Sequence, residues 1–197
     1  MWDIRYICQS DLIKQIIDNI ETMENFIFQN PTKLIFGKGM IGQLAKEIPA
    51  GKRILVTFGG GSVRKNGVYD QVKEALKGFE VTEFWGIEAN PKRKAIELGK
   101  EKKVDYLLAV GGGSVIDGTK LISAGILYEG DAWDLVLKGC EKHTLPLGTV
   151  LTLPATGSEM NSGAVISRKE TAEKYPFYSN YPVFSILDPT VTYTLPP

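Results

Sequence analysis

RILVTFGGGSV at residues 53–63 and DYLLAVGGGSV at residues 105–115 are the two stretches that decide the fold. Each opens with a continuous apolar run of the kind found in strands that are buried on both faces of a sheet. Each run then ends at three glycines, which mark a tight turn. Strands of this type, separated by helical segments, predict a parallel sheet with crossover helices on its faces.

Helices and strands alternate along the rest of the chain. Helices are expected at residues 39–49, 67–77 and 91–103 and from Ser114 onward, and further strands at residues 81–85, 148–154, 163–167 and 182–187. Residues 26–37, around the turn signal Asn30-Pro31, predict a small hairpin, and the stretch with Trp133 and Asp134 is expected to be irregular. The fold class predicted is α/β, a Rossmann-like, doubly wound, mainly parallel sheet with helices on both faces.

The first 22 residues differ from this pattern. Their apolar residues recur at helical spacing on one face, as shown by Leu12, Ile13, Ile16, Ile17 and Ile20. We therefore expect residues 1–22 to form a helical extension that docks on the body or on a partner chain. Residues 23–197 are expected to form one dinucleotide-binding α/β domain.

Composition excludes several classes of function. Lys and Arg number 23 and Asp and Glu also number 23, so the chain lacks the basic surplus that duplex nucleic acid would require. No stretch reaches the roughly 20 apolar residues of a membrane span, and the start lacks the features of a secretory signal. Cys8 and Cys140 lie far apart and are interpreted as free thiols of a reducing compartment. A cytoplasmic protein with no membrane partner is expected.

The two glycine turns are candidates for holding a phosphate group. They comprise Gly59, Gly60, Gly61 and Ser62 after the first strand, and Gly111, Gly112, Gly113 and Ser114 after the other. Glycines allow positive φ and let a phosphate approach the backbone N–H groups, and a helix that starts at the serine adds its positive dipole end. Neither turn matches a P-loop or G-x-G-x-x-G. The alternative is that they only make tight turns, with Ser114 and Asp117 as a capping box.

A third candidate is the hydroxyl-rich loop TLPATGSEMN at residues 152–161. It follows a predicted strand, so it should lie at the same edge of the sheet as the glycine turns. Thr152, Thr156 and Ser158 could be presented there to sugar or phosphate oxygens. The alternative interpretation is an ordinary polar loop.

Four motifs in order give the chain a family resemblance: GGGSVRKNG, GGGSVIDGTK, TLPATGSEMNSGAVIS and LDPTVTYTLPP. From Met23 to Pro197 the chain resembles the iron-containing, or group III, alcohol dehydrogenases, in particular the NADPH-dependent butanol dehydrogenase and aldehyde reductase branch. That resemblance implies an α/β dinucleotide domain, followed in the family by an all-helical domain. It also implies hydride transfer between a nicotinamide and a primary alcohol or aldehyde, such as butanol or butanal.

Site residues follow from the resemblance by position. It implies that Gly111 to Ser114 hold the pyrophosphate, that Thr152, Thr156 and Ser158 line the nicotinamide ribose and phosphates, and that Lys174 and Thr194 also contact the cofactor. Asp117 is implied near the nicotinamide and substrate, and Asn161 near the substrate pocket. Asn90 matches a family asparagine near the adenosine, and it also fits a helix cap.

Coenzyme choice is expected to be NADP(H). NAD-specific relatives place a carboxylate just after the first of these strands, where it accepts hydrogen bonds from the ribose 2′-hydroxyl and repels a 2′-phosphate. Here Phe58 is followed by the turn Gly59 to Ser62, with Arg64 and Lys65 close behind. The alternative is that these two cations are only the solvated start of a helix.

The catalytic metal of the family, a divalent ion such as Fe, Zn or Mn, is expected to find no ligands here. The resemblance places its ligands, an aspartate and three histidines, after the TLPP segment with which this chain closes. Asp188 is not that aspartate. His143 is the one histidine in the sequence, and it is expected in a surface loop.

The leading hypothesis is therefore a truncated chain, fragment or split gene product that forms the NADP(H)-binding half of a metal-dependent alcohol dehydrogenase and is inactive alone. A second hypothesis is a non-catalytic NADP(H)-binding or interaction module. A third, the glycerol dehydrogenase or dehydroquinate synthase type, fits the TLPATGSEMN segment less well. The face that meets the helical domain in the family should be apolar, which favours a homodimer.

Overall fold

The structure is a computed structural model that describes residues 27–87, 92–141, 143–168 and 171–194. The helix expected at residues 1–22, Cys8 and Asn90 lie outside the described residues. Among the described residues, no helix combines the length and the apolar character needed to cross a membrane.

Six parallel strands form the central sheet, in the order β1-β8-β5-β4-β2-β3. They are β1 (Lys33–Phe36), β2 (Arg53–Phe58), β3 (Glu80–Phe84), β4 (Tyr106–Gly111), β5 (Leu147–Leu151) and β8 (Phe184–Leu187). The central strands β4 and β5 are buried along their whole length, as expected of continuous apolar runs covered on both faces. The predicted α/β fold with a parallel sheet is confirmed.

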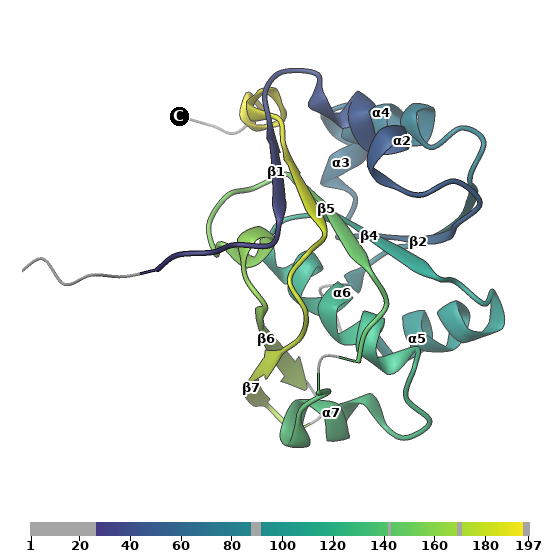
Figure 1. Ribbon diagram of the computed structural model, residues 1–197, viewed down its shortest axis with the longest axis vertical. Coiled ribbons are helices and arrows are strands. Elements are labelled where there is room, and N and C mark those ends of the chain that lie inside the picture. Colours follow the sequence, from purple (N-terminus) through teal and green to yellow (C-terminus); the bar gives the residue numbers. More distant parts are fainter. Residues whose placement is uncertain (1–26, 88–91, 142, 169–170, 195–197) are drawn as a thin grey trace, which may run out of the picture.

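Helices cover the two faces of this sheet (Figure 1). On one side lie η2 (Met40–Gln43), α2 (Leu44–Glu47), α3 (Ser62–Lys65) and α4 (Val68–Ala75), and on the other α5 (Lys92–Glu101), α6 (Gly113–Gly125) and α7 (Ala132–Lys138). Each side has its own apolar cluster: Val68 and Val72 of α4 pack in the first, and Ile116 and Ile122 of α6 in the second. The fold is therefore doubly wound.

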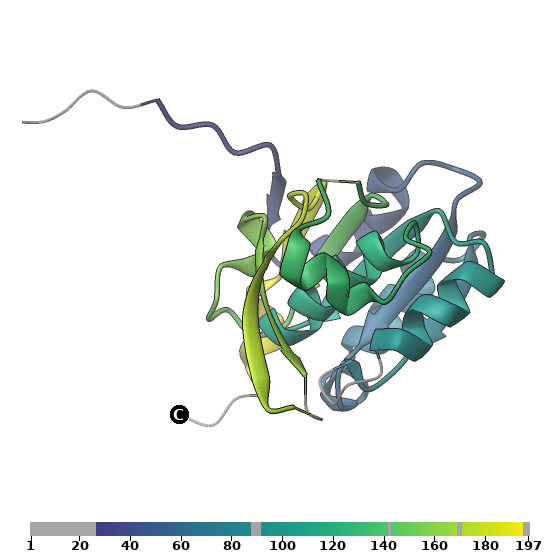
Figure 2. The same cartoon turned by 90° about the horizontal axis from the view of Figure 1, so that it is seen from below.

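A second, two-stranded sheet packs outside the main one (Figure 2). Its strands, β6 (Gly163–Arg168) and β7 (Glu173–Tyr178), are antiparallel. Ile166 and Phe177 of this hairpin pack with Leu121 of α6. The sequence predicted β6 but missed β7, because most side chains of β7 are exposed and no apolar run marks it.

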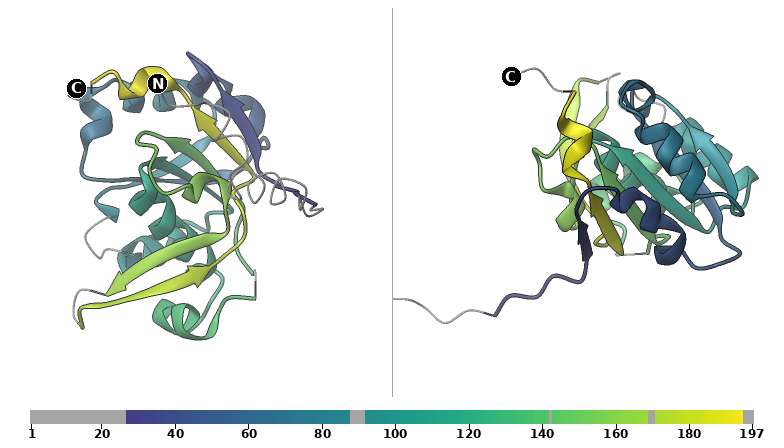
Figure 3. Two further views of the ribbon diagram at one scale, coloured as in Figure 1. Left: turned by 90° about the vertical axis from the view of Figure 1, so that its left-hand side faces the viewer. Right: turned by 90° about the horizontal axis from the view of Figure 1, so that it is seen from above.

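Two predicted features are wrong. Residues 26–37 do not form a hairpin: β1 pairs in parallel with β8, and among the described residues before it there is no strand. The Asn30 side chain instead donates to the carbonyl of Met160 and accepts from the N–H of Thr32, and β1 forms the outer edge of the sheet (Figure 3). Trp133 and Asp134 lie in α7 and not in irregular chain, because Asp131 caps that helix by accepting from the Trp133 N–H.

One short 3-10 helix follows β8 among the described residues. Asp188 follows β8 and caps η5 (Pro189–Thr192) by accepting from the N–H and hydroxyl of Thr190, and it also accepts from the Gly39 N–H. These hydrogen bonds hold the pKa of the Asp188 carboxyl below its ordinary value although burial opposes them. Asp188 is thus a structural cap.

Candidate functional site

The two glycine turns lie side by side at the carboxyl edge of the sheet. Strands β2 and β4 are neighbours, and their last paired residues are Phe58 and Val110. The helices that follow these strands leave on opposite faces, since Val63 of α3 packs in one apolar cluster and Val115 of α6 in the other. A point where the connections from two neighbouring strands turn to opposite faces is the crevice in which open α/β sheets bind ligands.

The second turn leads directly into the longer helix. Val115 and Ile116 donate their N–H groups to the Gly112 carbonyl, and no hydrogen bond from another described residue occupies the N–H groups of Gly113 and Ser114. Helix α6 has 13 residues, so its start carries free donors and the positive dipole end together. The turn can therefore hold an anion such as a pyrophosphate.

Of the two predicted reasons for the glycines, positive φ applies to the first turn only. Gly61 has a φ of 103°, which glycine adopts without strain. None of the three glycines in the second turn has a positive φ; there close approach is the cause, because a Cβ on Gly113 would lie 2.3 Å from the Thr156 hydroxyl oxygen. The predicted capping box is also absent: Gly112 is the N-cap, no side chain caps the helix, and Asp117 accepts from Val165 instead.

The first turn is flanked by a stack of aromatic rings and a cation. The rings of Phe58 and Trp85 stack with centroids 4.2 Å apart, and the Arg64 guanidinium lies 4.0 Å from the Trp85 ring centroid. The Glu83 carboxylate accepts from the Tyr69 hydroxyl and the Trp85 indole, which raises the pKa of Tyr69. Helix α3 has only four residues, so its dipole is small, and the positive character here comes from Arg64 and Lys65.

The hydroxyl-rich loop packs against the second turn as its position after β5 predicts. Thr152 donates its N–H to the Gly111 carbonyl at 3.0 Å. Thr156 is exposed beside Gly113, whereas Ser158 is buried with its hydroxyl 2.7 Å from that of Thr156. The Thr156 side chain is thus accessible to a ligand, and its hydrogen bond to the buried Ser158 hydroxyl holds it in place.

Asp117 is buried beside this loop and has one free oxygen. Its Oδ2 accepts from the Val165 N–H at 2.9 Å, and its Oδ1 is buried without a hydrogen-bond partner among the described residues. A buried carboxylate oxygen without a donor costs free energy, which a ligand N–H would relieve. This orphaned atom, one turn of helix from the anion-binding N–H groups, fits a cofactor that carries an amide.

Lys120 is the functional candidate that the sequence analysis missed. It is fully buried in α6, and its ammonium donates to the backbone carbonyls of Ser158, Asn161 and Gly163. Burial lowers its pKa to about 8, while the carboxylates of Asp117 and Glu159 act in the opposite sense. The available signal was a lysine three positions after Asp117 in a helix with no other charged residue.

The remaining predicted residues differ in their hydrogen bonding and in their exposure. Both ends of the Asn161 amide are hydrogen-bonded: its Nδ2 donates to the Gly157 carbonyl, and its Oδ1 accepts from the Lys120 ammonium at 3.3 Å. Lys174 is exposed on β7 opposite Ser167, and Thr194 is exposed after η5. Nothing in the described contacts brings Lys174 or Thr194 against the glycine turns.

The part of the chain that the structure describes has no group of three His, Cys, Asp or Glu residues that could hold a metal ion. His143 is exposed in a loop, and Cys140 is buried with its thiol 3.3 Å from the Tyr178 carbonyl. These residues do not provide the three protein ligands that a catalytic zinc-type site requires.

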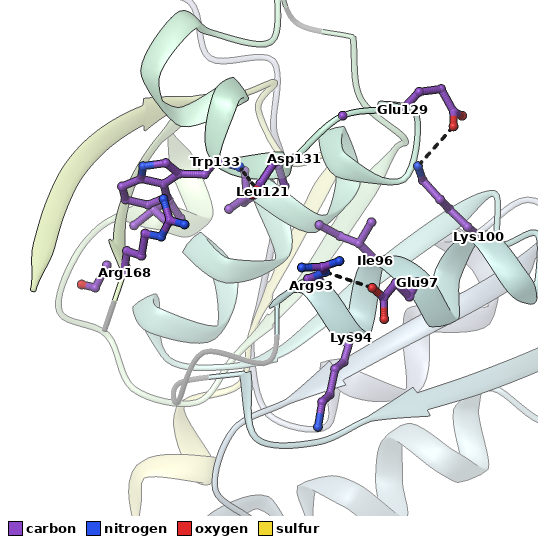
Figure 4. Close-up of a pocket in the computed structure, with 14 residues that line it drawn as sticks. Arg93, Lys94, Ile96, Glu97, Lys100, Leu121, Glu129, Asp131, Trp133 and Arg168 are labelled. Atoms are coloured by element: carbon purple, nitrogen blue, oxygen red, sulfur yellow. Dashed lines mark hydrogen bonds and ion pairs between the residues drawn. The ribbon is translucent and has the colours of Figure 1, made fainter. Parts of the chain in front are cut away.

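A cavity of about 700 Å³ lies apart from the glycine turns (Figure 4). It is lined by α5, α6, the start of α7 and β6, and its charged side chains are largely satisfied: Arg93 pairs with Glu97, Lys100 with Glu129, and Arg168 lies over Trp133. No residue that the sequence predicted for the site lines it. The turns, and not this cavity, carry the nucleotide-binding prediction.

Comparison with known proteins gives consistent matches. The family model described as iron-containing alcohol dehydrogenase matches residues 31–189. The chain is 54% identical over 185 residues to an NADPH-dependent aldehyde reductase of Escherichia coli, covering 89% of this chain and 48% of that protein. It is also 54% identical over 184 residues to a probable NADH-dependent butanol dehydrogenase of Bacillus subtilis, covering 88% and 48%.

A solved structure agrees with these sequence matches. The NADH-dependent butanol dehydrogenase A of Thermotoga maritima superposes with a TM-score of 0.82 at 50% identity, covering 88% of this chain and 46% of that one. The chain thus spans about half the length of the relatives that it matches.

Proposed function

The chain belongs to the iron-containing alcohol dehydrogenase family, and from that premise we propose that it is the NADP(H)-binding half of a metal-dependent alcohol dehydrogenase or aldehyde reductase. The reaction proposed for the whole enzyme transfers a hydride between NADPH and a primary alcohol or aldehyde such as butanol or butanal. The observation that carries the proposal is the pair of glycine turns side by side at the switch point of the sheet.

The described residues fit a dinucleotide in three places. The free N–H groups of Gly113 and Ser114, at the start of α6, suit the pyrophosphate. The exposed hydroxyl of Thr156 lies beside them and suits a ribose or phosphate oxygen. The orphaned Oδ1 of Asp117 suits the N–H of the nicotinamide carboxamide.

A bound reduced nicotinamide would supply the hydride that the aldehyde carbon needs, and a proton would complete the alcohol. The task of this chain is to bind and orient that ring. Asp117 is suited to it because its other oxygen is fixed by Val165, so the free oxygen has a defined direction. The family's metal would polarise the substrate oxygen, but the described residues offer it no group of three His, Cys, Asp or Glu ligands.

Preference for NADPH over NADH is the finer part of the proposal. The relatives matched include both NADPH-dependent and NADH-dependent enzymes. Support comes from the first turn, where no carboxylate follows β2 and Arg64 is held close by the Trp85 ring. The Glu83 carboxylate, one residue before the end of β3, is engaged by Tyr69 and Trp85. A 2′-phosphate would meet a cation and no free carboxylate.

Titration of the purified chain with NADPH and NADH tests this choice, with Gly60→Asp as the informative variant. A Cβ at Gly60 meets nothing within 4 Å and Gly60 has no positive φ, so both Gly60→Asp and its neutral control Gly60→Asn should fold. We expect the carboxylate to weaken NADPH binding by about tenfold or more, and the amide to change it little. Equal effects of the two variants, or wild-type preference for NADH, would contradict the NADP(H) assignment.

Turnover separates the proposed half-enzyme from its alternative. We expect the 197 residues to bind NADPH but to show no butanal-dependent NADPH oxidation, even with added Fe²⁺, Zn²⁺ or Mn²⁺. Turnover by the chain alone would show that it does hold a working metal site. Turnover that appears only in a longer product of the same coding sequence would support the half-enzyme over a non-catalytic module.

A further inference from the structure

Lys120 is a fully buried cation without an ion pair among the described residues. Its Nζ lies 2.8 Å from the Ser158 carbonyl, 2.8 Å from the Asn161 carbonyl and 2.6 Å from the Gly163 carbonyl. An ammonium has three N–H donors, so its donors match three backbone acceptors. Buried lysines are rare because the charge loses its hydration, and such a complete set of partners indicates a specific task.

The three carbonyls belong to one stretch of chain that links the hydroxyl-rich loop to the hairpin. Ser158 opens the 3-10 helix η4 (Ser158–Met160), and Gly163 is the first residue of β6. Just after this stretch, Asp117 accepts from the Val165 N–H, and Ala164 and Ile166 pack with Leu121 of α6. Within residues 158–163, the hydrogen bonds to α6 come from Lys120. The ammonium therefore fixes the loop to the helix whose start carries the free N–H groups.

Loop position decides what a ligand meets at the second turn. Thr156 packs on Gly113, and the Thr156 hydroxyl is hydrogen-bonded to the Ser158 hydroxyl. The Ser158 carbonyl in turn accepts from Lys120. A chain of contacts thus runs from the buried ammonium through Ser158 to the exposed Thr156 hydroxyl.

We propose that Lys120 is a positioning residue of the nucleotide site, which holds residues 158–163 on α6 and thereby keeps Thr156 at the Gly111–Ser114 turn. This inference rests on the proposed NADP(H) function. Lys120 itself is too deeply buried to touch the nucleotide. Its effect should be confined to the pyrophosphate and nicotinamide part of the ligand.

The first turn offers an internal reference because it has a separate support. Gly86 donates its N–H to the carbonyls of Phe58 and Gly59, and Arg64 stacks on Trp85. None of the described contacts of Lys120 reaches this turn. Adenosine 2′-monophosphate, which carries the adenosine and the 2′-phosphate but has neither the pyrophosphate nor the nicotinamide half, should therefore bind independently of Lys120.

The experiment compares NADPH and adenosine 2′-monophosphate in calorimetric titrations of wild type and Lys120→Met. Methionine keeps an unbranched side chain of similar length but leaves the three carbonyls without donors. We expect NADPH to bind about tenfold or more weaker and the monophosphate to stay within about twofold of wild type. Lys120→Arg, which restores a cation with N–H donors, should recover part of the loss. The matched control Lys46→Met, at an exposed lysine of α2, should change neither affinity.

Each other result overturns a distinct claim. If Lys120→Met weakens both ligands equally or neither, Lys120 has no selective positioning role and this inference fails while the proposed function stands. If wild type binds neither ligand, the proposed function fails as well.

Asn161→Ala covers the case in which Lys120→Met does not fold. It removes the side chain whose Oδ1 accepts from the Lys120 ammonium and whose Nδ2 donates to the Gly157 carbonyl. The hydrogen bonds from Lys120 to the three backbone carbonyls remain. NADPH should bind about threefold weaker and adenosine 2′-monophosphate unchanged; equal losses for the two ligands would contradict the inference.

Discussion

Burying the charge of Lys120 costs free energy, and three hydrogen bonds from its ammonium to carbonyl oxygens offset part of that cost. Charged hydrogen bonds are stronger than neutral ones, yet desolvation still lowers the pKa of Lys120 to about 8. Gly113 and Thr156 were predictable from the sequence as binding residues because their types suit phosphate and sugar groups. Lys120 was not predicted because a lysine in a helix is ordinarily solvated, and only the tertiary structure reveals that this position faces three carbonyls.

A pH dependence of stability follows from that pKa. The folded value of about 8 lies below the ordinary 10.5, so between these two values the unfolded chain binds more protons and folding becomes more favourable as pH rises. We expect the free energy of unfolding of wild type, relative to Lys120→Met, to increase by about 2 kcal/mol from pH 7.5 to pH 9.5. Urea unfolding of both proteins at the two pH values measures this, and a difference that is constant or falls with pH would contradict it.

Among the elements, α6 and its preceding turn carry most of the proposed site. Both glycine-terminated strands were predictable because each is a continuous apolar run that ends at a turn signal. The hairpin expected at residues 26–37 was wrong because β1 pairs with β8, a partner that no local pattern identifies. Strand β7 was not predicted because most of its side chains are exposed, so its sequence carries no apolar run.

The turn before α6 should tolerate a methyl group at Gly112 but not at Gly113. A Cβ on Gly113 would lie 2.3 Å from the Thr156 hydroxyl oxygen, whereas a Cβ on Gly112 would approach no closer than 3.5 Å, to Leu153. We expect Gly113→Ala to destabilise the fold by about 1–3 kcal/mol and to weaken NADPH binding, and Gly112→Ala to be nearly neutral for stability. Urea denaturation of the two variants is the measurement; similar stabilities for both would show that the loop is not packed tightly on this turn.

For the whole molecule, exposed apolar side chains favour association with another chain. Leu34 and Phe36, on the same side of the edge strand β1, are 50% and 67% exposed, and Ile27 and Phe28 nearby are more exposed still. Edge strands with apolar side chains tend to pair with other chains. We propose that the chain forms a homodimer, which light scattering at increasing protein concentration would reveal; a monomer at every concentration would contradict this.

The central claim is that the nucleotide binds across the switch point between β2 and β4. Amide hydrogen exchange of the 197-residue chain, with and without saturating NADPH, tests this claim most directly because it reports which backbone segments the nucleotide protects. The cavity lined by α5, α6, α7 and β6 contains none of the glycine-turn residues, so binding there would protect different segments. The account predicts slower exchange at residues 59–62, 111–115 and 152–158 when NADPH is bound. Protection confined to the residues that line that cavity, or no protection anywhere, would contradict it.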